Sequence, residues 1–419
     1  MAALGRYHRA MSSTAAQAPH SVTLRQDAGV IGLVGVAHMI SHFSQLLLPP
    51  LFPWLREAFG ASYTQLGLLM TVFFAVSCSV QAAAGFLVDR YGPRPILFAG
   101  LVLIGAAAFA DAASRNYAGL VLGSVLAGIG NGVFHPVDYT LLNRKVSARH
   151  LGHAYSVHGI TGSLGWALAP AVIVPLAIAF SWRIALVACG GIAYAVLALL
   201  WLNRRPLALP RAAPRPLAAA TGGNVEFLRI PAVWMCFAFF LLWAFILSGV
   251  QAFAPEAARQ LHGVPVALAG MCVTVYMVCS AGGMVLGGFL AANPARCERV
   301  VGAGFGLAAL VAISVALTPV PALAVPALFG VMGFGAGIAG PSRDLLVKRS
   351  TPENATGRVY GVVYSGLDIG QALAPLAFGP LMDHQNYRGV WLALVVVQAL
   401  LITSAFRVQR VRRTVAVAA

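Results

Sequence analysis

Long apolar runs separated by short polar turns dominate the chain, and they restrict it to a fold whose helices cross a membrane. A helix needs about 20 apolar residues to span the hydrocarbon core of a bilayer. The runs of roughly this length are 29–54, 63–88, 95–112, 117–142, 152–180, 183–203, 231–255, 264–291, 299–317, 321–347, 357–382 and 388–406. They are continuous rather than alternating, which favours helices over the strands of a membrane β-barrel. The sequence therefore predicts an all-α polytopic membrane protein with twelve transmembrane helices.

Composition supports this class and argues against a soluble one. Only 10% of the 419 residues are charged and 59% are hydrophobic, whereas a soluble domain has about 25% charged residues. The six cysteines show no CxxC spacing, which favours packing roles over disulfides or a metal site. The sequence contains no G-x-x-x-x-G-K-[ST] motif for ATP. We therefore expect no enzyme, no cofactor and no ATP-driven pump.

The distribution of Lys and Arg predicts how the chain sits in the membrane. If the N-terminus is cytoplasmic, 22 of the 28 basic residues fall on that side, five fall on the other, and Arg343 lies within a run. This asymmetry agrees with the positive-inside rule. The net charge of +16 then faces an anionic leaflet, so a nucleic-acid partner is not expected. We expect an integral protein of the bacterial inner membrane with both termini cytoplasmic.

The two halves of the chain repeat each other. A shift of 205 residues aligns A-L-A-P at 167–170 with A-L-A-P at 372–375, and a shift of 203 aligns Gly67 and Thr71 with Gly270 and Thr274. Two six-helix bundles that rock about a central site are typical of secondary transporters. The predicted organisation is a cytoplasmic tail (1–28), a first bundle (29–203), a cytoplasmic linker (204–230), a second bundle (231–406) and a cytoplasmic tail (407–419).

The turn after the second run carries the most specific motif, Gly85-Phe-Leu-Val-Asp89-Arg90-Tyr-Gly92-Pro-Arg94. It resembles the G-x-x-x-D-[RK]-x-G-[RK]-[RK] loop of the major facilitator superfamily. With the twelve runs and the repeat, the resemblance covers nearly the whole chain. It implies two pseudo-symmetric six-helix bundles and a cytoplasmic gate formed by Gly85, Asp89, Arg90, Gly92 and Arg94. A charged anchor that only keeps the loop in water is the alternative.

Two further motifs resemble the fosmidomycin-resistance-like, drug–proton antiporter branch of that superfamily. The chain has H-M-I-S-H at 38–42, where the branch has H-x-x-N-D, and F-H-P at 134–136, where the branch has F-H-P-E. His42 and Val137 replace the two acids of that pattern. The resemblance implies transport of small organic compounds, but the missing acids leave drug efflux open.

Polar side chains within the runs are the candidate site, because such residues are costly in a bilayer and usually functional. His38 and His42 are four residues apart, so they share one helix face. They could bind an anion or relay protons, or only hydrogen-bond between helices. His135 precedes Pro136, which breaks the helix ladder and frees polar groups for a ligand. The predicted substrate-binding residues are His38, His42, Gln45, Asn131, His135, His158, Trp166, Arg343, Tyr364 and Gln371.

Three charged residues complete the predicted machinery. Asp138 and Arg343 correspond under the 205-residue shift, so a salt bridge between them could close the cytoplasmic mouth of the cavity. Arg343 could instead clamp a substrate carboxylate, or pair locally with Asp344. Asp368 lies within the eleventh run, where a buried carboxylate can take up and release one proton per cycle. We predict Asp368 and Asp138 as proton-coupling residues.

Together these features predict secondary active transport of a small organic solute by alternating access, coupled to protons as a symporter or antiporter. The histidines and Arg343 favour an organic anion such as a carboxylate. Proton-driven efflux of drugs or metabolites is one alternative, and a membrane receptor of the same fold without turnover is another. The expected partners are the substrate, protons and the lipid bilayer, and we expect the monomer to be the functional unit.

Overall fold

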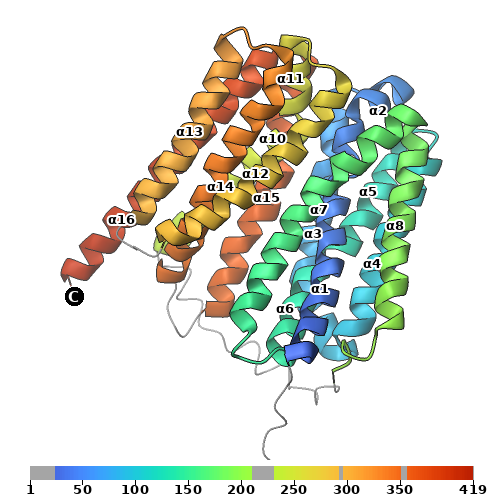
Figure 1. The fold of residues 1–419 in the computed structure, drawn as a ribbon, viewed down its shortest axis with the longest axis vertical. Helices are drawn as coiled ribbons and strands as arrows, with labels where there is room; N and C mark the ends of the chain where they lie inside the picture. The colour runs from blue at the N-terminus through green and yellow to red at the C-terminus, as the bar shows by residue number, and fades with distance from the viewer. Residues whose placement is uncertain (1–23, 210–230, 292–295, 351–355, 419) are drawn as a thin grey trace, which may run out of the picture.

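The computed structural model describes residues 24–209, 231–291, 296–350 and 356–418, and almost all of these are helical (Figure 1). Eleven helical segments among them are long and apolar enough to cross a membrane, and α15 is a further long helix beside them. The all-α, twelve-helix prediction is therefore confirmed. The elements are α1 (Leu24–Gln45), η1 (Pro49–Leu51), α2 (Phe52–Phe59), α3 (Tyr63–Tyr91), α4 (Pro93–Ala113), α5 (Tyr117–Asn131), α6 (Phe134–Lys145), α7 (Leu151–Ala179), α8 (Trp182–Leu202), α10 (Pro231–Ala252), α11 (Ala254–His262), α12 (Val266–Ala291), α13 (Cys297–Leu317), η4 (Ala322–Ala324), α14 (Val325–Ser350), α15 (Thr356–Asp383) and α16 (Tyr387–Ala418).

The helices form two bundles with equivalent packing. In the first bundle α1 packs on α7, and α4 packs on both α5 and α8. In the second, α10 packs on α15, and α13 packs on both α14 and α16. Figure 1 shows the first bundle in blue to green beside the second in yellow to red.

The repeated residues lie where the two bundles meet. The bundles contact each other mainly through α3 against α15 and through α7 against α12. The Thr71 hydroxyl donates to the backbone oxygen of Ala372 at 2.7 Å, and the Thr274 hydroxyl donates to that of Ala167 at 2.8 Å. These are corresponding residues of the two halves, so the duplication visible in the sequence forms a pseudo-symmetric pair of contacts between bundles.

Glycines bring the bundles together near α2 and α11, at what we call the closed end. A Cβ on Gly67 would lie 2.8 Å from Pro375, and a Cβ on Gly270 would lie 2.6 Å from Val174. Only glycine allows such a close approach. Figure 1 shows the bundles adjoining at this end and diverging toward the other, which we call the open end.

The fourth predicted span is broken in the middle. α5 ends at Asn131 and α6 begins at Phe134, with a turn at Gly132 and Val133 between them. Pro136 follows in the first turn of α6, where its missing N–H does not cost a helical hydrogen bond. α6 contacts α1 and α7, and it carries His135 and Asp138.

The loop after α3 has the turn that its motif predicts. Gly92 has φ of 85° and ends α3 while preceding Pro93 at the start of α4. A positive φ of this kind favours glycine. Asp89 and Arg90 are exposed at the open end, where the bundles are apart. The proposed gate role of this loop therefore remains a prediction for a state in which that end is closed.

Glycines also bring α7 onto α1 and α15 onto α10. A Cβ on Gly165 would lie 2.3 Å from the backbone oxygen of Met39, and a Cβ on Gly370 would lie 2.3 Å from that of Leu241. The two glycines correspond under the 205-residue shift. Their shared environment supports a packing role for the glycines of these two helices.

Replacing Gly165 by Ala should therefore destabilise the first bundle. The added methyl group meets backbone atoms, which cannot rotate away, and overpacking of this kind costs about 1–3 kcal/mol. Gly159→Ala is the matched control, because a Cβ on Gly159 has no atom within 4 Å. We expect the melting temperature in detergent to fall for Gly165→Ala and to stay unchanged or rise for Gly159→Ala. Equal melting temperatures would contradict this packing account.

Candidate functional site

Four imidazoles and one carboxylate gather inside the first bundle, and we call this group the histidine cluster. Its members are His38 and His42 from α1, His135 and Asp138 from α6, and His158 from α7. The rings of His38 and His158 stack with centroids 3.5 Å apart, and those of His38 and His42 lie 4.4 Å apart. The four-residue spacing on α1 thus brings both of its histidines to the same neighbours.

Asp138 holds two of these rings. Its Oδ2 lies 3.0 Å from Nδ1 of His38 and 3.2 Å from Nε2 of His158, so a ring N–H of each histidine donates to the same oxygen. Asp138 is fully buried, and a buried carboxylate depends on such donors for its stability. Its Oδ1 has no hydrogen-bond partner in the described part of the chain. Asp138 and the two imidazoles therefore form one unit.

His42 stands out because neither of its ring nitrogens has a hydrogen-bond partner among the described residues, although both are buried. The ring packs against Trp166 at a centroid distance of 4.3 Å. It also lies beside Gly162, where a Cβ would approach the ring to 2.9 Å. A buried polar group without a partner costs free energy, so a ligand that contacts His42 would remove that cost.

Neutral polar side chains form a network next to the histidines. Oδ1 of Asn131 accepts from the Ser41 hydroxyl at 2.7 Å and from Nε2 of Gln45 at 3.3 Å. Nδ2 of Asn131 donates to the Ser77 hydroxyl at 2.8 Å. The Trp166 indole N–H donates to Oε1 of Gln45 at 2.9 Å. Gln45, Asn131 and Trp166, which the sequence predicted separately, are thus joined in one network.

Gln81 on α3 links the histidine cluster to the second bundle. Its Oε1 lies 3.0 Å from Nδ1 of His135, and its Nε2 donates to Oδ2 of Asp368 at 3.3 Å. Asp368 therefore lies at the boundary between the bundles, in contact with the first. Sequence analysis missed Gln81, although a polar residue within the apolar run 63–88 was a usable signal.

Among the other predicted residues of the second bundle, Gln371 has a described side chain. Gln371 is buried, and its Oε1 has no hydrogen-bond partner in the part of the chain that the structure describes. The side chains of Arg343 and Tyr364 lie outside the described residues. The predicted salt bridge between Asp138 and Arg343 is therefore untested, while the partners of Asp138 in this structure are His38 and His158.

A second polar site, absent from the sequence prediction, lies at the closed end. Asp383, the last residue of α15, accepts from the backbone N–H of Tyr63 at 2.6 Å and from that of Thr64 at 3.0 Å. It also accepts from the Thr64 hydroxyl at 2.5 Å. The start of α3 carries the positive end of its helix dipole, which favours a carboxylate. Asp383 thus joins the two bundles as a charged cap.

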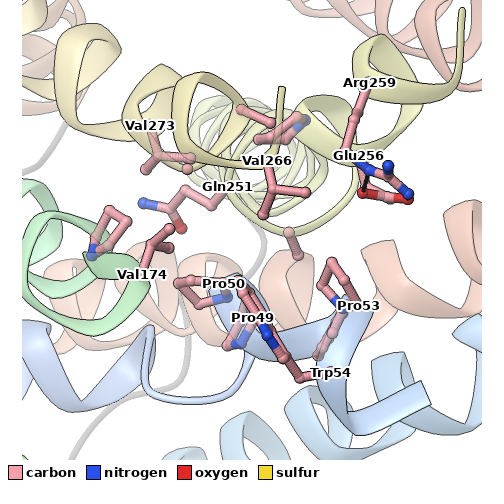
Figure 2. Close-up of a pocket in the computed structure, with 16 residues that line it drawn as sticks. Pro49, Pro50, Pro53, Trp54, Val174, Gln251, Glu256, Arg259, Val266 and Val273 are labelled. Carbon is pink, nitrogen blue, oxygen red and sulfur yellow. Dashed lines mark hydrogen bonds and ion pairs between the residues drawn. The ribbon is translucent and has the colours of Figure 1, made fainter. Parts of the chain in front are cut away.

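Glu256 on α11 adds polar contacts at the same closed end. It accepts from the Tyr63 hydroxyl at 3.1 Å and pairs with Arg259 through N–O distances of 2.6 and 2.8 Å. The hydrogen bonds from Arg259 to Glu256 raise the pKa of the guanidinium. Figure 2 shows this pair at the rim of a pocket that Pro50 of the first bundle and Gln251 of the second also line.

Replacing Asp383 by Ala should open the closed end. Burial alone would raise the pKa of Asp383, but the donors from Thr64 and Tyr63 outweigh it and lower that pKa. The cap therefore acts above the ordinary aspartate pKa of about 3.9 and is lost as the pH falls through the lowered value. Because the site is partly exposed, we expect a change of roughly tenfold in the closed–open equilibrium.

Distances between spin labels on α2 and α11 would report this equilibrium. They should lengthen in Asp383→Ala at pH 7, and in the unmodified chain only in strong acid. Asp383→Asn should show no such acid-dependent step. Identical distance distributions in the unmodified chain and Asp383→Ala would rule out the cap.

Two overlapping groups in the histidine cluster have a geometry that could hold a metal ion. They are His38 with His42 and His135, and His38 with Asp138 and His158. In each group the candidate ligand atoms lie within 4.8 Å of one another. Apart from metal binding, the cluster can exchange protons among its rings, because imidazole both donates and accepts.

Comparison with known proteins places these features in context. The profile of the Major Facilitator Superfamily matches residues 34–375 and 256–418. The fosmidomycin resistance protein of Escherichia coli is 26% identical over 37% of this chain and 38% of its own length. The "Probable sulfoacetate transporter SauU" of Cupriavidus necator is 23% identical over 39% of this chain and 38% of its own length. These alignments thus span less than half of either relative.

Solved structures support the fold. A bacterial homologue of the human lysosomal transporter Spinster, in an inward-facing and unoccupied conformation, superposes with a TM-score of 0.75. The superposition covers 93% of this chain and 98% of the other, at 17% sequence identity. This similarity shows a common fold.

Proposed function

Because the chain belongs to the Major Facilitator Superfamily, we propose that it is a membrane transporter of small solutes, and that it works as a secondary active transporter coupled to protons. The observation that carries this proposal is the chain of contacts from His135 through Gln81 to Asp368. It joins the polar interior of one bundle to an ionisable group on the other. A proton gained or lost at Asp368 would change this contact, and with it the balance between the two arrangements of the bundles.

Alternating access requires the two ends of the bundle interface, the closed end and the open end, to open in turn. The positive-inside rule assigns the closed end to the outside of the cell and the open end to the cytoplasm. The structure then corresponds to a cytoplasm-facing arrangement of a protein of the bacterial inner membrane. In the opposite arrangement, Asp89 with Arg90 and Arg94 would form the cytoplasmic gate. A salt bridge between Asp138 and Arg343 would form part of that gate, or Arg343 would instead bind the substrate carboxylate.

We infer that the substrate is a small organic anion such as a carboxylate. Imidazole N–H groups, the Trp166 indole and the Arg343 guanidinium are donors suited to carboxylate oxygens. The relative named as a sulfoacetate transporter supports an anionic organic substrate. The relative named for fosmidomycin resistance favours the second candidate, proton-driven efflux of drugs or metabolites.

A thermal-shift screen of the purified chain tests the substrate class. The panel would contain small carboxylates and sulfonates, lipophilic cations and neutral drugs, all with a chelator present. We expect the anions to raise the melting temperature, and His42→Gln to weaken that effect. Stabilisation by cations or neutral compounds alone would overturn the anion proposal and favour the efflux candidate.

A further inference from the structure

We propose that His38, His42 and His135 form a binding site for one divalent first-row transition-metal ion, for which Zn²⁺ is the probe. The proposal goes beyond the transport function, because metal binding at this site does not depend on whether the chain transports an organic anion. The candidate nitrogen atoms of the three rings lie within 4.8 Å of one another. Tetrahedral Zn²⁺ with bonds of about 2.0–2.1 Å requires about 3.4 Å between ligand nitrogens. Where two of the nitrogens are farther apart than this, side-chain rotation must bring them together when the ion binds.

Two of the three rings already have the kind of hydrogen-bond partner that orients metal-binding histidines from outside the ligand set. Nδ1 of His38 lies 3.0 Å from Oδ2 of Asp138, and Nδ1 of His135 lies 3.0 Å from Oε1 of Gln81. When Nδ1–H donates to an oxygen, the tautomer is set and Nε2 presents its lone pair. Histidines that bind metal almost always have such a carboxylate or carbonyl partner.

The third ring points independently to a ligand. His42 is only 9% exposed, and neither of its nitrogens has a hydrogen-bond partner among the residues described. A Cβ on Gly162 would lie 3.1 Å from Nε2 of His38 and 3.0 Å from Nδ1 of His42. The two rings therefore pack directly against Gly162, and the absence of a side chain there lets both nitrogens lie close to the same point.

The other candidate group, His38 with Asp138 and His158, is less suitable. Oδ2 of Asp138 lies within hydrogen-bonding distance of both rings, so their N–H groups already occupy this oxygen. In our assignment Asp138 instead stays outside the metal's ligand set. There it orients His38 and offsets part of the charge of the ion.

The ligand set determines the class of ion. Three imidazoles suit Zn²⁺, Ni²⁺, Co²⁺ or Cu²⁺, whereas Mg²⁺ and Ca²⁺ require oxygen ligands. Three protein ligands also leave a fourth position for water or for an oxygen of a second ligand. The site is thus an exchangeable one rather than a closed structural one.

Equilibrium binding to the full-length chain tests the proposal. The protein would carry a tag without histidines, be stripped with a chelator and be dialysed into metal-free detergent buffer. We expect one Zn²⁺ per chain by elemental analysis, a rise in melting temperature with Zn²⁺, and no rise with Mg²⁺. Co²⁺ should give the intense visible absorption of a tetrahedral site. Absence of bound Zn²⁺ and of the Co²⁺ spectrum in the unmodified chain would overturn the proposal.

Variants assign the binding to these residues. His42→Gln and His135→Asn should each lose the Zn²⁺-dependent rise in melting temperature. His153→Gln should keep it, because His153 is an exposed histidine of α7 outside the cluster. Binding that survives in His42→Gln, or that is lost in His153→Gln, would contradict the assignment. Organic-anion flux measured in chelator reports on transport alone, so failure of one proposal is distinguishable from failure of the other.

Discussion

Asp368→Asn is expected to reduce proton-driven accumulation of substrate to background while leaving substrate exchange across the membrane intact. Asn has nearly the same shape as Asp, and its Oδ1 can still accept from Nε2 of Gln81, which contacts Asp368 at 3.3 Å. The variant therefore removes the exchangeable proton and keeps the contact between bundles. Exchange of substrate needs the bundles to rock, but it needs no net movement of protons.

Two transport modes of reconstituted liposomes separate these effects. Accumulation is measured under an imposed pH gradient, and exchange is measured with substrate on both sides and no gradient. Asp111→Asn is the matched control, because Asp111 is also a buried acid but lies within the first bundle against α5, beside Gly123. It should retain accumulation. Unchanged accumulation in Asp368→Asn would exclude Asp368 as the coupling residue.

Asp138→Leu is expected to have the largest effect on stability. Leu keeps the branched arrangement of four side-chain heavy atoms, but it leaves the ring N–H groups of His38 and His158 buried without their acceptor. Removing one partner of a buried charged hydrogen-bonded group costs about 3–5 kcal/mol. We expect a markedly lower melting temperature in detergent and loss of transport. Asp138→Asn should lose less stability, because its amide oxygen still accepts from the rings.

A triple substitution controls for the unpaired rings. With His38 and His158 both replaced by Phe in the Asp138→Leu background, the buried N–H groups are gone and stability should partly return. If Asp138→Leu is as stable as the unmodified chain, Asp138 does not hold the histidine cluster together.

Much of the architecture was predictable because it depends on local pattern. The length of the apolar runs predicted the transmembrane helices. The internal repeat aligned Thr71 with Thr274, and the structure places both at the interface between the bundles. The four-residue spacing of His38 and His42 likewise placed them on one helix face. In each case the physical cause, helix periodicity or duplication, is visible in the order of residues.

Contacts between distant segments were not predictable in this way. Asp383 caps the start of α3 although 319 positions separate it from Thr64, and no periodicity connects the two. The repeat relates Asp138 to Arg343 of the other bundle, but it carries no information about neighbours within the same bundle. It therefore could not show that His38 and His158 surround Asp138. Gln81 was overlooked because one amide within an apolar run changes its hydropathy little.

The most direct test of the central proposal is solute-driven proton movement in liposomes that contain the purified chain and a pH-sensitive dye. The added solutes are the anions that stabilise the protein in the thermal-shift screen. Proton-coupled transport predicts a change of internal pH when the anion is added, absent in Asp368→Asn and in liposomes without protein. Stabilisation by the anion with no proton movement and no anion flux would contradict the proposal and identify a receptor that binds without turnover.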